Sequence, residues 1–449
     1  MKKNKTKKAV IILVAIVIVI AAIIAAAHLL INIFEENIIA ALTKRIEKNP
    51  KIDSVKFGEV DINLFKRSIT IENLSIDTTK ELKIHLPVLE IEGISVFGLI
   101  FGKIPAVGRL SVKTAEVVFP GGFYTLKVKE LLLSRSKSSI SINSLEMIPA
   151  YGKYRFSRKR GYRSDRVELK IDAVTFRDVD FKNLLKKKGF YSRLLTLESP
   201  RLSIFRDRNV SRSRTPKKKK FPQQLLRELK FILRIDKIKI SQGRIAYAEH
   251  NESARKAGEV FFSELDAEIK NVTNDPRVIK EGAALVLSGA AKLNGKAVFR
   301  VHMAMPLDHK NNSFQFSGSI GRTNLKEFRT ILENNARLRI RSGILNKFSF
   351  SVRADNSKAA GEMRIHYKNF KISVLKKGKY TKAKFRSFLA NTIIPKNNPR
   401  SNRPLRIGRI YLKREERQSF FTYIWKALLT GIKSSLGLKK SKPRSAGSL

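Results

Sequence analysis

The chain has 449 residues, with 91 Lys and Arg against 38 Asp and Glu, and its formal net charge is +53. This length exceeds that of a typical single core and indicates an extended body or several packed units. So basic a chain favours an anionic partner surface, either nucleic acid or lipid head groups. The absence of Cys excludes a disulfide framework and a thiolate metal site.

The N-terminal segment joins a basic start to a long apolar run. Residues 1–8 are rich in Lys, and residues 9–34 contain no Asp, Glu, Lys or Arg. A helix of that length reaches roughly 39 Å, enough to cross a hydrocarbon core of about 30 Å with tilt. Because flanking Lys favours the cytoplasmic side, we expect a single-pass anchor with a cytoplasmic N-terminus. A signal peptide cleaved near residues 25–27 is the alternative.

Composition divides the chain into seven segments. We expect a cytoplasmic basic tail at 1–8, a transmembrane helix at 9–34, a first β-rich region at 35–205 and a basic loop at 206–220. A second β-rich region is expected at 221–414, an amphipathic helix at 415–437 and a basic disordered tail at 438–449. The basic loop is either a solvated segment or a contact for anionic head groups.

Between residues 51 and 411, apolar and polar residues alternate in many short stretches, which is the period of half-buried strands. Helical patterns are brief and lie at 95–101, 181–185, 223–233, 325–332 and 384–392. We therefore expect a mainly β fold with short helices, built on an elongated antiparallel sheet.

One apolar spacing recurs four times, with apolar residues at x, x+2, x+7 and x+9. The copies are Leu110, Val112, Val117 and Phe119; Val167, Leu169, Val174 and Phe176; Leu195, Leu197, Leu202 and Ile204; and Ile238, Ile240, Ile245 and Tyr247. The parity changes within each copy, so a turn or bulge must intervene if both apolar pairs are to face one side. Such a unit cannot bury its apolar side alone, so we expect the copies to stack side by side.

No catalytic, cofactor-binding or metal-binding pattern stands out. The six His are scattered, without the spacing of a zinc site. Residues 289–296 resemble a phosphate-binding loop but have one residue too many between the glycines, and we interpret them as a hairpin turn. We expect no enzyme activity, no cofactor and no metal. Nucleic acid is an unfavoured partner, because the basic residues are spread along the chain without a recognition motif.

The C-terminal segment has one strongly apolar helical side. It consists of Phe421, Ile424, Trp425, Leu428, Ile432 and Leu436, with Ser419 able to cap the start and Gly437 able to end the helix. This side either packs over the end of the sheet and covers its edge or lies in a membrane interface, helped by neighbouring lysines.

The chain resembles the AsmA-like family of bacterial envelope proteins, relatives of the TamB group, over most of residues 1 to 437 and most specifically in its C-terminal third. The residues that carry the resemblance are Gly361-Glu-Met363, Tyr367-Lys-Asn-Phe370, Ala390-Asn391, Asn397-Asn398-Pro399, Arg409 and the stretch from Ser419 to Lys426, and the N-terminal anchor agrees with it. The resemblance implies a curved, groove-like or taco-like sheet that shields acyl chains. It also implies a body in the periplasm, anchored in the bacterial inner membrane, that supports phospholipid transport or outer-membrane homeostasis.

The partners implied are phospholipid or another anionic lipid, the inner membrane and other envelope proteins. The groove candidates are Leu110, Val112, Val117, Phe119, Val167, Leu169, Leu195, Leu197, Ile238, Ile240, Ile245 and Tyr247. About fifteen strands at roughly 4.8 Å spacing make a sheet of only about 70 Å. The alternative is a non-enzymatic scaffold of the cell envelope with a closed β core. N-x-S/T sequons that begin at Asn73, Asn209, Asn251, Asn271 and Asn311 also leave open a secreted or eukaryotic type II membrane protein.

Overall fold

The computed structural model describes residues 52–63, 65–79, 81–94, 107–185, 188–213, 218–251, 256–308, 311–328, 333, 338–375 and 394–438. The expected basic tail at 1–8, the transmembrane helix at 9–34 and the helices at 95–101 and 384–392 lie outside these residues, as does the expected tail beyond residue 438. Over the described ranges, no helix combines the length and apolar character needed to cross a bilayer.

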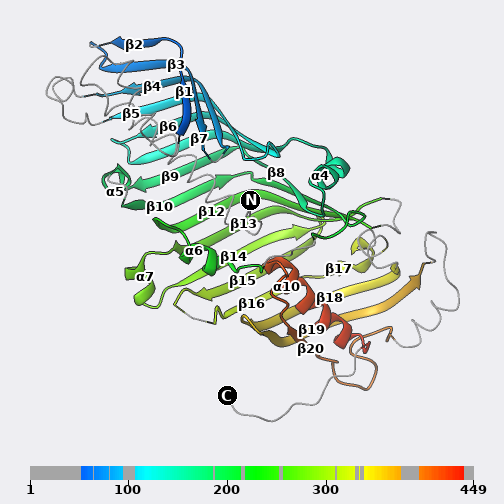
Figure 1. Ribbon diagram of the computed structural model, residues 1–449. Helices are drawn as coiled ribbons and strands as arrows, with labels where there is room; N and C mark the ends of the chain where they lie inside the picture. Colours follow the sequence, from blue (N-terminus) through cyan, green and yellow to red (C-terminus); the bar gives the residue numbers. More distant parts are fainter. Residues whose placement is uncertain are drawn as a thin grey trace.

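Strands dominate the described chain, as predicted, and the helices are few and short (Figure 1). The first ten strands are β1 Ile52–Lys56, β2 Val60–Asn63, β3 Ser68–Thr78, β4 Lys83–Glu92, β5 Arg109–Val118, β6 Tyr124–Ser134, β7 Ser139–Pro149, β8 Asp165–Ile171, β9 Ala173–Val179 and β10 Gly189–Glu198. The others are β11 Arg201–Asp207, β12 Ile232–His250, β13 Gly258–Thr273, β14 Ala284–Leu293, β15 Ala297–Pro306, β16 Phe314–Ile320, β17 Thr323–Asn324, β18 Leu338–Ala354, β19 Lys358–Val374 and β20 Gly408–Lys413. The helices are α4 Lys153–Lys159, α5 Phe181–Leu185, α6 Pro222–Arg227, α7 Pro276–Lys280, the 3-10 helix η1 Leu325–Phe328 and α10 Phe420–Ser435.

All twenty strands belong to one sheet, which follows the chain from β3 to β20. Strands β1 and β2 share the first edge, beside β3, and three further pairs share one position each: β8 with β9, β10 with β11, and β16 with β17. The twenty strands therefore occupy sixteen positions, and at about 4.8 Å per position the sheet extends roughly 70 Å along its curve.

The sheet is mixed, so the prediction of a wholly antiparallel sheet is wrong in one place. Strands β10 and β11 both run parallel to β12, with Gly189 opposite Ile232 and Arg201 opposite Arg244. Residues 208–231, which include α6, connect the end of β11 to the start of β12. A connection of that length is what parallel neighbours require, whereas a hairpin would have made them antiparallel.

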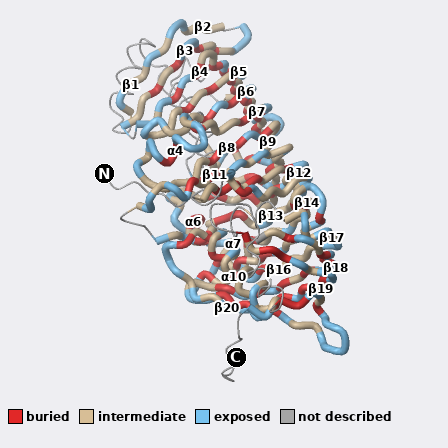
Figure 2. Tube along the Cα trace, turned by 90° about the vertical axis from the view of Figure 1, so that its right-hand side faces the viewer, coloured by how far each residue is buried: buried red, intermediate tan, exposed pale blue. Residues whose placement is uncertain are grey.

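The two edges of the sheet do not meet. One edge carries β1 and β2, the other carries β20, and no pairing joins them within the described residues. Most buried apolar side chains nevertheless form one continuous core cluster from Ile69 to Ala427. Figure 2 shows these buried positions recurring on neighbouring strands along the whole sheet.

Several local predictions can be compared with the structure. The predicted hairpin turn is confirmed in its last three residues: 294–296 join β14 to β15, with positive φ at Asn294 and Gly295, whereas 289–293 belong to β14. The helix expected at 181–185 is α5, but the one expected at 223–233 ends at Arg227. The basic loop begins after Asp207 rather than at residue 206, because Arg206 and Asp207 end β11.

Candidate functional site: an apolar face with a charged rim

Strand pairing aligns apolar residues into rows that run across the sheet. Row 1 crosses from β3 to β18 and consists of Ile69, Ile91, Leu110, Leu133, Ile140, Phe176, Leu195, Ile238, Ile269, Leu287, Met303, Phe316 and Val352. Row 2 is its neighbour and consists of Ile71, Leu89, Val112, Leu131, Ile142, Val174, Leu197, Ile240, Ala267, Gly289, Val301, Gly318, Phe350 and Met363. Neither row contains a polar side chain.

Row 3 lies on the other side of a bend in the strands. It consists of Ile76, Ile84, Val117, Leu126, Met147, Leu169, Leu202, Ile245, Phe262, Leu293 and Ala297. At the bend several strands hold a residue with positive φ, such as Asn73, Glu130 and Gln242. The bend changes the parity of the strand, so side chains before and after it face the same side. We call the side that carries these rows the apolar face.

The repeat found in the sequence becomes a side-by-side stack, as expected. Its second, third and fourth copies lie on three adjacent positions of the sheet. Their matching residues pair directly: Phe176, Leu195 and Ile238; Val174, Leu197 and Ile240; Leu169, Leu202 and Ile245; and Val167, Ile204 and Tyr247. In the first copy, Leu110, Val112 and Val117 join rows 1 to 3, whereas Phe119 lies just after β5 in the hairpin to β6.

Burial changes along the rows. Val112 is 1% exposed and Val117 is fully buried; rows 1 and 2 stay buried through β9, whereas row 3 contains the half-buried Met147 at β7. From β10 onward the same rows include side chains that are only half-buried, such as Leu197, Ile240 and Ile245. At the far end, Met363 in row 2 is covered again, because Gly431 of α10 lies against it. The accessible part of the apolar face is therefore the middle of the sheet.

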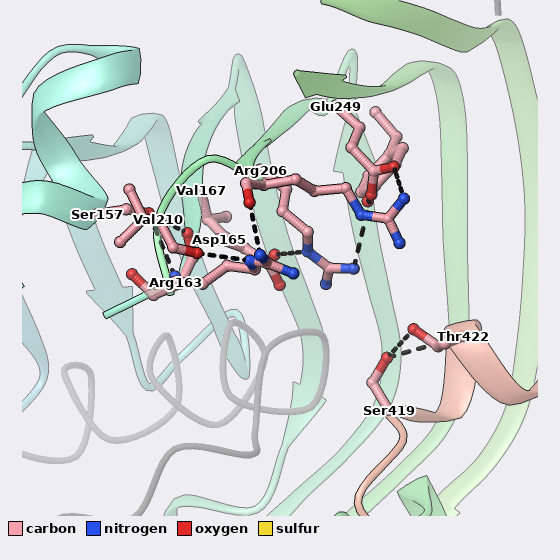
Figure 3. A network of polar contacts seen from close by, with 12 residues as sticks. Ser157, Arg163, Asp165, Val167, Arg206, Val210, Glu249, Ser419 and Thr422 are labelled. Carbon is pink, nitrogen blue, oxygen red and sulfur yellow. Dashed lines mark hydrogen bonds and ion pairs between the residues drawn. The ribbon is translucent and has the colours of Figure 1, made fainter. Parts of the chain in front are cut away.

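A row of charged residues borders the apolar face at β8, β11 and β12. Asp165, Arg206 and Glu249 pair across these strands, two residues beyond Val167, Ile204 and Tyr247. Because side chains two apart share a side, this charged row and the apolar face have the same orientation. Figure 3 shows the three charged side chains projecting together from adjacent strands. We call them the rim row.

The rim row is held by ion pairs. Arg206 Nε lies 2.6 Å from Asp165 Oδ1, and Arg206 Nη1 lies 4.0 Å from Glu249 Oε2. Burial lowers the pKa of Arg206, but the adjacent Asp165 carboxylate more than offsets that effect, so the pKa is raised and the guanidinium stays charged. Tyr247 donates a hydrogen bond of 2.8 Å to Glu249 Oε2, and burial raises its pKa, which keeps the hydroxyl protonated.

Further cations gather beside the rim row and exceed its carboxylates. Arg208 Nη1 lies 3.2 Å from Glu249 Oε1, and Arg163 donates hydrogen bonds to the main-chain oxygens of Val210 and Arg208 (Figure 3). Burial lowers the pKa of Arg163, and neighbouring Arg212, Arg208 and Arg206 lower it further. Burial and Arg206 likewise lower the pKa of Lys219, against the opposing effect of Asp165. The repulsion that Arg163 meets from three neighbouring guanidinium groups would be relieved by an added anion.

The rim row was missed by sequence reasoning, which placed Arg206 in a loop. A signal was nevertheless present, because a charged residue stands two positions outside an apolar residue at Asp165, Arg206 and Glu249. Only the register shows that these charges alternate in sign across neighbouring strands. Within the described residues, no three His, Asp or Glu side chains lie close enough together to hold a metal ion.

The side of the C-terminal helix that packs overlaps the predicted one only in part. Phe420, Tyr423, Ala427, Gly431 and Ser435 are its buried residues. Phe421 is 65% exposed and Trp425 is 52% exposed, whereas Ile424, Leu428, Ile432 and Leu436 are half-buried. The helix covers the last edge of the sheet: the main-chain N–H groups of Arg409 and Tyr411 donate to the hydroxyls of Ser434 and Thr430.

Two comparisons with known proteins, against family models and against curated proteins, found no match for this chain. Functional argument therefore rests on the apolar face, the rim row and the charge of the chain.

Proposed function

We propose that the protein binds lipid, with acyl chains along the apolar face and an anionic head group at the rim row. The observation that carries this proposal is the coincidence of two features. Rows of apolar side chains run unbroken across the sheet, and a cation-rich cluster borders them where they become accessible, at β10 to β12. A lipid has an apolar chain and a polar head group, so it needs an apolar surface and a polar surface within the length of one lipid molecule.

The apolar rows supply the affinity for hydrocarbon. Each CH₂ group withdrawn from water contributes about 0.8 kcal/mol. An acyl chain that lies along row 1 or row 2 meets a similar apolar surface at every strand, so its energy changes little as it moves. We therefore expect movement along the rows to be passive, or to be driven by a partner.

The cations beside the rim row supply the affinity for a head group. Arg208 is exposed and pairs with a carboxylate that already contacts Arg206 and Tyr247. A phosphate oxygen accepts hydrogen bonds from a guanidinium in fork geometry, which makes Arg a frequent phosphate ligand. This arrangement favours phospholipid or another anionic lipid over a neutral fatty ligand.

The setting of this function follows from the sequence and is part of the proposal. The apolar run at 9–34 would anchor the chain in a bacterial inner membrane with the sheet in the periplasm, as in the AsmA-like proteins that the C-terminal third resembles. Phospholipid transport or outer-membrane homeostasis would then be the cellular role. A sheet of roughly 70 Å favours cooperation with other envelope proteins.

The test compares two substitutions on one strand. Leu197 is half-buried in row 2 between Val174 and Ile240, and its neighbour Thr196 faces the opposite side between Thr175 and Lys239. Both are changed to Asp in the full chain, and lipid that co-purifies is measured by mass spectrometry. We expect Leu197→Asp to remain folded and to lose lipid at least tenfold, since a charge must leave water to sit beside an acyl chain. Thr196→Asp should keep its lipid.

The second candidate function is a lipid-free scaffold of the envelope. It is favoured by the deep burial of rows 1 and 2 between β3 and β9, where Leu89 and Ile140 are fully buried. A scaffold predicts that the purified wild-type protein carries no lipid and that Leu197→Asp unfolds it. Loss of circular dichroism in that variant, together with lipid-free wild-type protein, would establish the scaffold and refute the groove.

A further inference from the structure

The outer side of α10 is apolar and exposed although the helix is already fixed to the sheet. Its inner side packs closely, with Gly431 against Ile410 and Met363. Phe421 and Trp425 are one helical turn apart on the outer side, 65% and 52% exposed. Soluble surfaces seldom display a Phe and a Trp together without a partner. These two residues are not needed to hold the helix in place.

Other exposed apolar residues lie at the same end of the molecule. Ile407, just before β20, and Tyr411, within it, are 41% and 55% exposed, and Leu438, just beyond α10, is 46% exposed. Helix α10 lies against β19 and β20 at the last edge of the sheet (Figure 1). Within the part of the chain that the structure describes, five of the nine well-exposed large apolar side chains therefore belong to this one end.

The charge of this end is strongly positive. Residues 394–438 contain ten Lys and Arg but only two acids, Glu415 and Glu416. Both acids are engaged locally: Glu415 lies 3.6 Å from Lys426, and Glu416 lies 2.7 Å from Lys218. Arg409, Lys413, Arg417 and Lys433 are exposed around the helix and its adjoining strand. A second copy of the chain is a poor occupant, because two such basic surfaces would repel each other.

We propose that the outer side of α10 docks onto an anionic lipid bilayer, with Phe421 and Trp425 at the level of the head groups. Trp is the aromatic residue most typical of the membrane interface, and basic residues beside it add attraction to anionic lipid. This contact is independent of lipid binding on the apolar face. It gives the sheet a second membrane contact, about 70 Å along the sheet from its first edge.

The chain supplies its own probe, because Trp425 is its single Trp. The full chain is reconstituted in nanodiscs of neutral phosphatidylcholine and titrated with vesicles that contain phosphatidylglycerol with brominated acyl chains. We expect Trp425 emission to shift to shorter wavelength and to be quenched by bromine. Vesicles of phosphatidylcholine alone should give neither effect, and added salt should weaken the binding.

Two variants sharpen the test. Phe421→Ser should weaken vesicle binding about tenfold, because it removes an aromatic side chain that would enter the interface. The matched control is Phe65→Ser, which changes an aromatic residue that is fully exposed near the first edge of the sheet. It should leave the quenching of Trp425 unchanged.

The outcomes separate this proposal from the function proposed above. If Phe421→Ser loses quenching but still co-purifies with lipid, both proposals stand. Quenching that persists in Leu197→Asp, which has lost its bound lipid, shows that docking does not depend on the apolar face. Docking is refuted if Trp425 is not quenched, if Phe421→Ser binds as well as wild type, or if the emission depends on protein concentration instead of vesicles, which would indicate self-association.

Discussion

Gly408→Ala tests how α10 is held against the sheet. Gly408 begins β20 and pairs with Met363 of β19. A Cβ atom at this position would lie 2.1 Å from Ser435 Oγ and 2.4 Å from the main-chain oxygen of Gly431. A serine hydroxyl can rotate away, but a helix carbonyl cannot move unless the helix moves with it. The substitution should therefore push α10 away from β20.

Two structural responses set the limits of the stability that Gly408→Ala would lose. Overpacking of a well-packed contact costs about 1–3 kcal/mol. Complete release of the helix would expose Phe420 and Tyr423, each worth roughly 1.5–3 kcal/mol of burial. The response that costs less free energy is the one that occurs. We therefore expect Gly408→Ala to lower stability by about 2–3 kcal/mol, in the upper part of the overpacking range, because the closest rigid neighbour is backbone.

Hydrogen exchange at two main-chain amides measures this loss of stability. The N–H groups of Arg409 and Tyr411 donate to Ser434 and Thr430, at 3.0 Å and 3.1 Å between donor and acceptor. Their exchange should become roughly 30- to 150-fold faster in Gly408→Ala, since each 1.4 kcal/mol corresponds to a factor of ten. The control is Gly321→Ala, where the nearest atom lies 3.9 Å away. Unchanged protection in Gly408→Ala would refute the close approach of helix and strand.

Two further predictions concern charged groups. Asp165→Asn leaves the guanidinium of Arg206 without its nearest carboxylate and should lower the free energy of unfolding, measured by chemical denaturation, by about 3 kcal/mol. Adding Arg206→Leu should recover most of that stability. A double variant as unstable as Asp165→Asn alone would contradict the pairing. Burial raises the pKa of Asp355, but hydrogen bonds from Ser357 and Lys358 outweigh it, so the folded pKa is lowered. Its contribution is therefore present above the unfolded pKa of about 3.9 and lost as pH falls through the folded pKa, and Asp355→Asn should flatten the stability profile below about pH 4.

Local chemistry made the strands and one turn predictable. The alternation in β3, β5 and β15 needs no distant partner to be recognised, and the positive φ of Asn294 and Gly295 follows from their residue types. The neighbours of a strand are a different matter. Nothing in the residues of β12 tells whether it meets β11 through a hairpin or, as here, in parallel after a long return, because that choice depends on chain connection rather than on side-chain pattern.

The side of α10 that packs could not be read from hydrophobicity. Both sides are apolar, and the bulky Phe421 and Trp425 outrank Ala427 and Gly431 on any such scale. Close approach to a strand, however, requires small residues where the backbones meet, and Gly431 provides this opposite Ile410. The predicted helix is therefore present, but Phe421 and Trp425 point outward, whereas Phe420 and Tyr423 pack inward.

The rim row could not be predicted from the sequence either, because it depends on the register between strands. Asp165 and Arg206 are far apart in sequence, and each is an ordinary charged residue in its own segment. They meet because β8 pairs with β11 over six consecutive residues, from Arg201 opposite Lys170 to Arg206 opposite Asp165. The alternating charges are thus a property of three strands together, and a pattern search within one strand does not find them.

The place where the apolar face is accessible decides which substitutions inform about function. A charge at Val112, which is 1% exposed, would have to be buried among Leu89 and Leu131, and the fold would fail whether or not lipid binds there. Leu197 belongs to the same row but is half-buried, and its partner on β12, Ile240, lies nine residues before Glu249 of the rim row. A charge there can stay hydrated while it still interrupts the row. Loss of lipid without loss of fold is therefore a result that only an open, lipid-binding face can give.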